Sequence, residues 1–181
     1  MYRKISTLIL LAFFTVCFAS FSFAASTKIG VIDIKEVVNN CKYGQSIMQQ
    51  LNKKYEELKT KLQQEVKKLE ELKQEIQNKS ALWSKEVKEK KQEEYQKLLQ
   101  EVRQLQQESE VEMQAYQQKL LQPLFNKLEK VISDYAKDND YDLIIEKKQP
   151  GIYYASPKID ITNKIIKILD NMYEENKNLN E

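Results

Sequence analysis

Residues 51–76 read LNKKYEELKTKLQQEVKKLEELKQEI, and this stretch decides the fold. Seven of eight positions spaced in alternating steps of four and three, from Leu51 to Ile76, are apolar, and Glu65 is the exception. This heptad spacing gives a narrow stripe that becomes buried only against another helix. The stripe is too narrow for the face of a globular core helix, so the sequence predicts a coiled coil.

The helical region extends well beyond this stretch. Residues 45–122 contain no Gly or Pro and consist mainly of Glu, Lys, Gln and Leu, which are good helix formers. Asn and Ser near residues 78–84 favour a turn, and Ser84 is placed to cap a second helix. A second apolar run starts at Tyr95, so folding back places Leu62 near Val102 and Leu58 near Leu105. We therefore predict an antiparallel hairpin arm over residues 44–122, with its turn near 78–84.

The predicted arm seam is the set of apolar side chains at these heptad positions. It comprises Leu51, Tyr55, Leu58, Leu62, Leu69, Leu72, Ile76, Tyr95, Leu98, Val102 and Leu105. Beyond Leu105 the seam continues through Ser109 and Glu112, which are polar. We therefore expect the arm to pack most loosely at this end.

Both ends of the chain carry short β patterns. Residues 28–33 and 141–146 each read as a strand, residues 152–154 as a third, and a last helix follows Pro157. The candidate oligomerisation strands contain Ile29, Val31, Ile32, Leu143, Ile144 and Ile145. The fold class predicted is α+β and mostly α: residues 25–43 and 123–181 form a small body from which the arm projects. So small a sheet is marginal alone, so we expect the body to oligomerise.

Residues 1–24 have the pattern of a secretory signal peptide. Arg3 and Lys4 precede an apolar run, and Ser22-Phe23-Ala24 fits a cleavage site. The exported chain would keep one cysteine, Cys41, as either a buried apolar side chain or a partner in a disulfide between chains. Of the 29 basic residues two lie before residue 25, which leaves 27 basic against 27 acidic side chains.

Composition excludes several functional classes. The chain has no His, so a His-based catalytic triad, a histidine general base and a His-ligated metal site are ruled out. No Gly-rich phosphate loop is present, and a neutral chain lacks the basic excess that nucleic-acid binding requires. We expect no enzyme activity and identify no catalytic, metal or cofactor-binding residues.

The order of these segments resembles one known family. The strand Ile29-Gly30-Val31-Ile32-Asp33, the long hairpin, the strand at 141–145 and the segment YASPKIDIT at 154–162 are together similar to the Skp/OmpH family of periplasmic chaperones. The resemblance implies a homotrimer whose strands share one body and whose arms enclose a cavity. It also implies an ATP-independent holdase that binds unfolded outer-membrane proteins in the periplasm. Relatives are commonly strongly basic, whereas this exported chain is neutral.

The predicted arm tip is locally basic. Residues 79–91 hold five lysines and two glutamates, a net charge of +3. Lys85, Lys88, Lys90 and Lys91 are candidate contacts for a client or a membrane surface, although a solvated helix face explains them equally well. A different function, that of an exported oligomeric coiled-coil structural or adhesive protein, accounts for the helices but gives no reason for strand-bearing ends.

Overall fold

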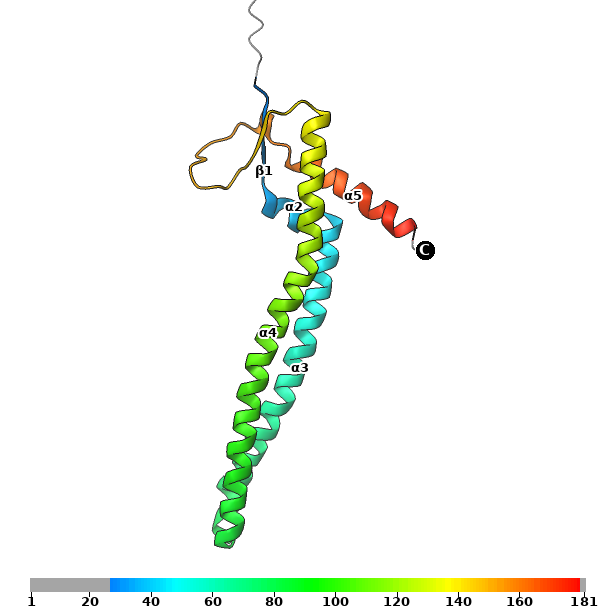
Figure 1. Cartoon of the computed structure of the whole chain (residues 1–181). Coiled ribbons are helices and arrows are strands. Elements are labelled where there is room, and N and C mark those ends of the chain that lie inside the picture. The colour runs from blue at the N-terminus through cyan, green and yellow to red at the C-terminus, as the bar shows by residue number, and fades with distance from the viewer. Residues whose placement is uncertain (1–26, 180–181) are drawn as a thin grey trace, which may run out of the picture.

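The computed structural model describes residues 27–179, in which one long helical arm projects from a small body (Figure 1). In chain order the elements are β1 (Ile29–Ile32), α2 (Ile34–Asn40), α3 (Lys42–Lys79), η1 (Ser80–Leu82), α4 (Lys85–Asp138), β2 (Leu143–Glu146), η2 (Pro157–Ile159) and α5 (Thr162–Asn178). The predicted fold class is confirmed: the chain is mostly helical, with a hairpin arm and a small strand-containing body. The predicted signal peptide lies outside the described residues.

The arm is built from α3 and most of α4, which lie side by side (Figure 1). Helix α3 has 38 residues and α4 has 54, so at 1.5 Å per residue they are about 57 and 81 Å long. The chain reverses through the short 3-10 helix η1. The hydroxyl of Ser84 accepts a hydrogen bond from the backbone N–H of Val87, so Ser84 caps α4 as expected.

The two strands form a parallel pair. Ile29 lies opposite Leu143 and Ile32 opposite Glu146. Parallel strands cannot be joined by a tight turn and need a long crossover connection. In this chain the connection contains α2 and the whole arm, so pairing of the two strands fixes both ends of the arm to one body.

The third predicted strand, at residues 152–154, is wrong. These residues belong to an irregular loop between β2 and η2, which extends away from the helices (Figure 1). Tyr153 and Tyr154 are 99% and 82% exposed. Their β-forming side chains suit a strand, but residues 152–154 pair with neither β1 nor β2, and the residue that bridges to the outer side of β1 is Asp160.

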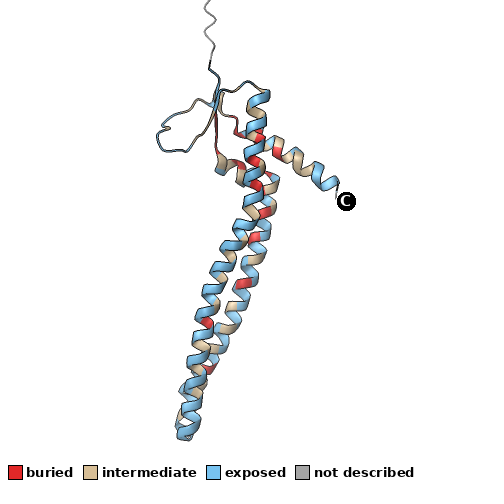
Figure 2. Ribbon diagram, in the orientation of Figure 1, coloured by how far each residue is buried: buried red, intermediate tan, exposed pale blue. Residues whose placement is uncertain are grey.

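The hydrophobic core lies where the body meets the arm, and burial thins out along the arm (Figure 2). Its members come from both chain ends and from the adjoining turns of α3 and α4. They are Ile32, Val37, Cys41, Ile47, Leu51, Leu124, Leu128, Val131, Ile161, Ile165 and Leu169. The base of the arm is therefore anchored in the same core that holds the strands.

The junction between α2 and α3 is unusually close. A Cβ atom on Gly44 would lie 1.6 Å from the carbonyl oxygen of Val38, so only glycine fits there. Cys41 Sγ accepts a hydrogen bond from the Gly44 N–H at 3.4 Å and thereby caps α3. Cys41 is fully buried, and burial raises the pKa of its thiol. The buried apolar role fits this position better than a disulfide between chains.

A polar network ties the end of β1 to the loop after β2. The buried carboxylate of Asp33 accepts from the N–H of Glu36 and caps α2, and it pairs with Lys148 Nζ at 2.6 Å. The hydroxyl of Thr162 accepts from the Asp33 N–H. The hydrogen bond from Lys148 is the main cause that holds the pKa of Asp33 below its ordinary value. Asp33 therefore stays ionised despite its burial.

Replacing Gly44 by Ala tests the junction. The added methyl group must displace the Val38 carbonyl, so we expect Gly44→Ala to lower the free energy of unfolding by about 3 kcal/mol. Urea unfolding followed by circular dichroism measures this. The matched control is Gln49→Ala on the exposed face of the same helix, which should change stability by less than about 0.5 kcal/mol. Equal effects of the two changes would contradict the close packing.

Replacing Asp33 by Asn tests the buried ion pair. A depressed folded-state pKa means that the carboxylate contributes fully above its unfolded pKa of about 3.9 and loses this contribution as the pH falls through the folded value. We expect Asp33→Asn to cost about 1–2 kcal/mol at pH 7 and less at pH 3. The exposed control Asp134→Asn should cost less than about 0.5 kcal/mol at both. A cost of Asp33→Asn that is the same at both pH values would be evidence against the pair.

Candidate functional site

The long surface of the arm is the candidate site, and two ion pairs between its helices define the register. Lys54 Nζ lies 2.6 Å from a carboxylate oxygen of Glu112, and Lys91 Nζ lies 3.4 Å from one of Glu75. The hydrogen bond from Lys54 is the main reason that the pKa of Glu112 is lowered. Both pairs match an antiparallel hairpin, within a few residues of the pairing expected from the sequence.

Most of the predicted seam residues meet between the helices. Leu51, Leu58, Leu72 and Val102 are buried, and a further group is partly buried. That group consists of Leu62, Leu69, Ile76, Tyr95, Leu98 and Leu105. One seam assignment is wrong, because the side chain of Tyr55 is 54% exposed. Lys54 is the less exposed of the two neighbours, so the helix turns Tyr55 to the rim of the seam.

Beside Tyr55 the surface of the arm is hollowed, and we call this hollow the arm groove. It has a volume of about 500 Å³ and contains both apolar and amide side chains. The lining residues are Tyr55, Leu58, Lys59, Leu62, Gln106, Ser109, Glu110, Met113, Gln114 and Gln117. The groove therefore offers apolar surface next to hydrogen-bonding groups.

Of the two polar seam positions expected beyond Leu105, Ser109 lies at the seam and Glu112 does not. Ser109 is partly buried, lines the arm groove and donates its hydroxyl to the Leu105 carbonyl. Glu112, in contrast, is exposed and pairs with Lys54. Met113 takes the inward position instead, because the seam on α4 advances in steps of four at this point and so passes over residue 112.

The four candidate lysines of the arm tip are not equivalent. Lys85 is very exposed and lies 3.8 Å from Glu89. Lys88 and Lys90 have no carboxylate within ion-pair distance among residues 27–179. Lys91 is different, because it is drawn between Glu75 and Glu94 and only 29% of its side chain is exposed. Lys91 thus joins the two helices and is a poor candidate for a contact.

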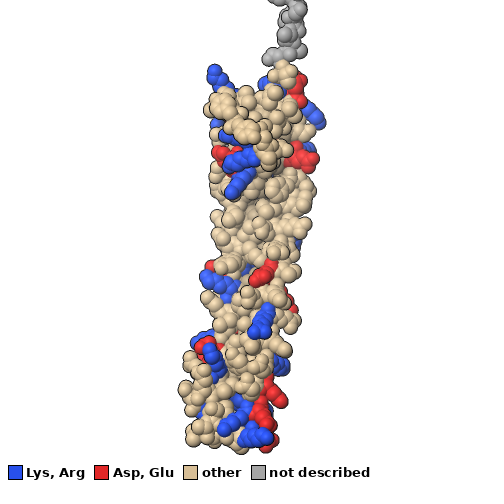
Figure 3. Space-filling view, turned by 90° about the vertical axis from the view of Figure 1, so that its left-hand side faces the viewer, with Lys and Arg blue, Asp and Glu red and all other residues tan. Residues whose placement is uncertain are grey.

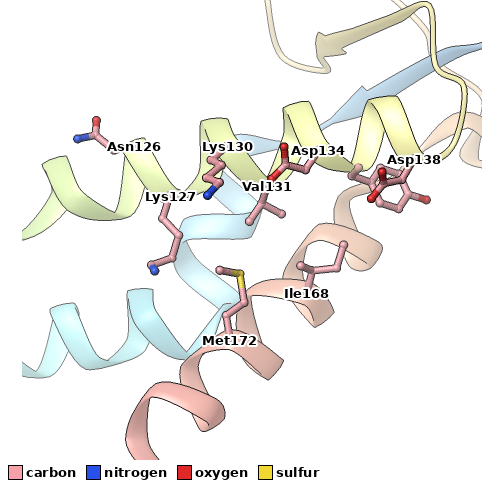
Figure 4. Close-up of a pocket in the computed structure, with 9 residues that line it drawn as sticks. Asn126, Lys127, Lys130, Val131, Asp134, Asp138, Ile168 and Met172 are labelled. Atoms are coloured by element: carbon pink, nitrogen blue, oxygen red, sulfur yellow. The ribbon is translucent and has the colours of Figure 1, made fainter. Parts of the chain in front are cut away.

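A second cavity of about 500 Å³, which no sequence pattern predicted, lies in the body between α4 and α5 (Figure 4). Val131, Ile168 and Met172 form its apolar part. Lys127 lies at its edge, with its ammonium 5.1 Å from the centre of the Tyr43 ring. The cavity was missed because α5 and this part of α4 are far apart in sequence and each alone reads as an ordinary amphipathic helix.

The candidate oligomerisation strands divide between core and surface. Val31 and Ile32 are buried, whereas Ile29 and Leu143 are partly exposed and Ile144 and Ile145 are intermediate. Phe125, on α4 in the body, is also partly exposed. The body thus presents apolar side chains around its two strands as well as on the loop with Tyr153 and Tyr154.

No cluster of acidic or sulfur ligands suited to a metal ion occurs between residues 27 and 179. Across the same residues, no helix has the length and apolar character needed to cross a membrane.

Comparison with known proteins yields one family. The model of the OmpH-like outer membrane proteins matches residues 28–169, well over half of the chain. Six chains among the solved structures match as well. One is the crystal structure of an OmpH-like protein from Caulobacter crescentus CB15, with a TM-score of 0.73 and 17% identity, covering 82% of this chain and 86% of the other. At this identity the likeness shows the fold. No curated protein matches.

Substituting Ser109 tests whether the arm groove is a true packing defect. Leu at this position would add apolar contacts beside Leu58 and Met113, so we expect Ser109→Leu to stabilise the arm by about 1 kcal/mol. Glu112→Leu should give no gain, because it removes the pair with Lys54 at an exposed position. Thermal unfolding of both variants decides the matter, and equal stabilisation would contradict the corrected seam.

Proposed function

The chain belongs to the OmpH-like family of outer membrane proteins, and we propose that it is an ATP-independent periplasmic holdase for unfolded outer-membrane proteins. In this proposal a homo-oligomer, with three chains as the expected number, holds its client between the arms and prevents aggregation in transit. Membership of the family supports a chaperone role in general. The single observation that carries the finer proposal is an arm that closes most of its seam internally and still leaves an apolar groove open beside polar amides.

A holdase must bind many sequences weakly, which favours broad, shallow surfaces over a deep specific pocket. The arm groove fits this requirement. Tyr55 and Met113 offer apolar contact, and the nearby glutamines can donate to or accept from the backbone of an extended client. Many such contacts along several arms would add up through effective concentration, without any one of them being strong.

The part of the arm nearest the body is poor in charge. Residues 43–52 contain no charged side chain, and residues 113–126 contain only Lys119. Figure 3 shows a broad uncharged band on this face, below the charges of the body. Met48 and Phe125 are exposed within these segments. We call residues 43–52 and 113–126 the uncharged belt. An unfolded apolar client can approach this belt without displacing ion pairs.

Oligomerisation rests on the body. Within residues 27–179 no strand pairs with the outer edge of β2, whereas Asp160 and Ile161 bridge to the outer edge of β1. Open sheet edges are usually covered in stable proteins. Ile29 on β1, Leu143 on β2, and Tyr153 and Tyr154 on the loop after β2 are exposed apolar side chains. In the proposal a neighbouring chain covers them, so that several arms extend from one shared body.

The proposal also includes export to the periplasm. The signal-peptide pattern and the family support this part. The competing function, an exported structural or adhesive coiled coil, would not need the open groove. The two functions differ in one measurable property, namely whether the protein keeps an unfolded barrel protein soluble.

The experiment mixes residues 25–181 with an outer-membrane barrel protein diluted from urea, without nucleotide, and follows light scattering. We expect suppression of aggregation by the wild type. Tyr55→Ser with Met113→Ser should weaken client affinity about tenfold through lost apolar contact. The matched control, Val66→Ser with Val111→Ser, removes two exposed apolar side chains outside the arm groove and should change affinity less than twofold.

Two outcomes would contradict the proposal. If the client aggregates as fast with the wild type as without it, the protein is not a holdase. If both double variants weaken client affinity equally, the arm groove does not bind the client. Multi-angle light scattering of the same samples measures the mass of the free protein and of the complex. A single chain per particle would contradict the enclosure of the client between arms.

A further inference from the structure

The second half of α5 lies beyond the residues that match the family. The family match ends at residue 169, whereas α5 continues to Asn178. We call residues 170–178 the α5 extension. Figure 1 shows α5 leading away from the strands and past α4, and it contacts both α3 and α4. Leu169 is the last buried residue of α5, so burial in the core does not hold the extension in place.

Polar contacts fasten the α5 extension to the first turn of α3. A carboxylate oxygen of Asp170 accepts a hydrogen bond from the backbone N–H of Lys42 at 2.7 Å. The N–H groups at the start of a helix have no partner within that helix, so Asp170 supplies one from α5. Lys42 Nζ also lies 2.5 Å from a carboxylate oxygen of Glu174. The extension therefore holds the start of α3 through both its backbone and a side chain.

Tyr43, the second residue of α3, lies at the centre of these contacts. Its ring meets the Tyr173 ring edge to face, with the two ring centroids 4.9 Å apart. Its hydroxyl donates to the Met172 carbonyl at 3.2 Å and accepts from Asn176 Nδ2 at 2.6 Å. Lys127 of α4 lies over the same ring. Through one side chain the α5 extension therefore contacts α3 and, by way of Lys127, reaches α4.

The cavity between α4 and α5 gives the arm room to tilt. Val131 of α4 and Met172 of α5 lie on opposite sides of this cavity (Figure 4). Helices in a close-packed interior resist movement, because there is little empty space between their side chains. A cavity of about 500 Å³ removes part of that resistance on the α4 side. The contacts between the α5 extension and α3 then oppose a movement that packing alone does not prevent.

A small movement at the α5 extension becomes a large one along the arm. Helix α3 is continuous from Lys42 to Lys79, so a change of angle at its first turn moves the whole arm. Residues 169–176 span about 10 Å, and Lys61 lies about 28 Å along α3 from Lys42. A slip of about 1–2 Å between packed helices at the extension therefore displaces Lys61 by about 3–6 Å.

We propose that the α5 extension is a brace, which fixes the angle between the arm and the body and thereby limits the size of the client. This inference rests on the proposed function, in which the client is held between the arms of an oligomer. The angle of each arm then sets the width of the space between the arms. A braced arm keeps this space narrow, and release of the brace lets the arms spread around a larger client. Tyr43 is a positioning residue in this scheme, because it acts through the orientation of α3.

Pulsed electron paramagnetic resonance measures the angle without any client. Spin labels are placed in residues 25–181 at Lys35 on α2 and Lys61 on α3, which are both exposed. Cys41 is changed to Ser, and labelled chains are diluted in unlabelled ones, so that only the distance within one chain is measured. We expect a narrow distance distribution for the chain with its brace intact.

The brace variant combines Lys42→Gln, Tyr43→Phe and Asp170→Ala. These changes remove the ion pair and the hydrogen bonds described above and keep the ring packing of Tyr43, so the fold is preserved. We expect the distance distribution to broaden by about 3–6 Å, the displacement that a slip between packed helices gives at Lys61.

The matched control makes the same kinds of change on the arm, away from the α5 extension. It combines Lys97→Gln, Tyr95→Phe and Glu101→Ala, which remove the ion pair between Lys97 and Glu101 and one hydroxyl. We expect the control to leave the distance distribution as narrow as before. Circular dichroism confirms that both variants keep their helices.

The limit on client size is measured separately. The affinities for an 8-stranded and a 16-stranded outer-membrane barrel protein, each diluted from urea, are compared. We expect the brace variant to raise the ratio of large-client to small-client affinity about threefold, because the wide arrangement of the arms becomes more populated. The control variant should leave this ratio unchanged.

Three results would overturn the proposal. A distance distribution that is equally narrow in the wild type and the brace variant would show that the α5 extension does not fix the arm, and so would equal broadening in the brace and control variants. A broader distribution with an unchanged affinity ratio would show that the brace does not limit client size. If the wild type fails to suppress aggregation, the proposed function fails and the limit on client size with it. The distances, measured without a client, still decide whether the extension is a brace.

Discussion

The apolar seam between α3 and α4 holds two helices together over most of their length without a globular core. Full burial of a Leu side chain contributes about 2 kcal/mol, whereas an exposed ion pair contributes about 0.2–1 kcal/mol. The few buried residues, such as Leu58 and Leu72, therefore stabilise the arm more than the many surface ion pairs do. Because the seam is narrow, most of the surface of each helix stays free, and this is what gives the arm its polar flanks and its groove.

The body holds both ends of the hairpin together. Parallel pairing of β1 and β2 places residues 29–32, before the arm, beside residues 143–146, after it. The core around Leu128 and Ile165 then fastens the base of the arm, and Asp33 with Lys148 closes the polar side of the same joint. In a single chain the apolar side chains near the strands stay exposed. A neighbouring chain would cover them in the proposed oligomer.

The hairpin could be predicted because a heptad pattern followed by a turn signal has one simple solution. Finer assignments failed for physical reasons. Lys54 and Tyr55 both fit a step of three or four from Leu51, and Glu112 and Met113 both fit such a step from Ser109. The pattern therefore does not choose between them, and the phase of each helix does. The strand predicted at 152–154 failed because β propensity does not say whether a sheet edge is within reach. The body cavity depends on the packing of α5 against α4, which no local pattern records.

The account depends on the chain doubling back, so the most direct measurement is a distance across the arm. Spin labels at the exposed positions Lys53 and Val111 lie next to the Lys54–Glu112 pair, with Cys41 changed to Ser and labelled chains diluted in unlabelled ones. The account predicts a short distance within one chain, a small fraction of the span of a continuous rod. A distance near about 87 Å, which 58 helical residues would give, would contradict it.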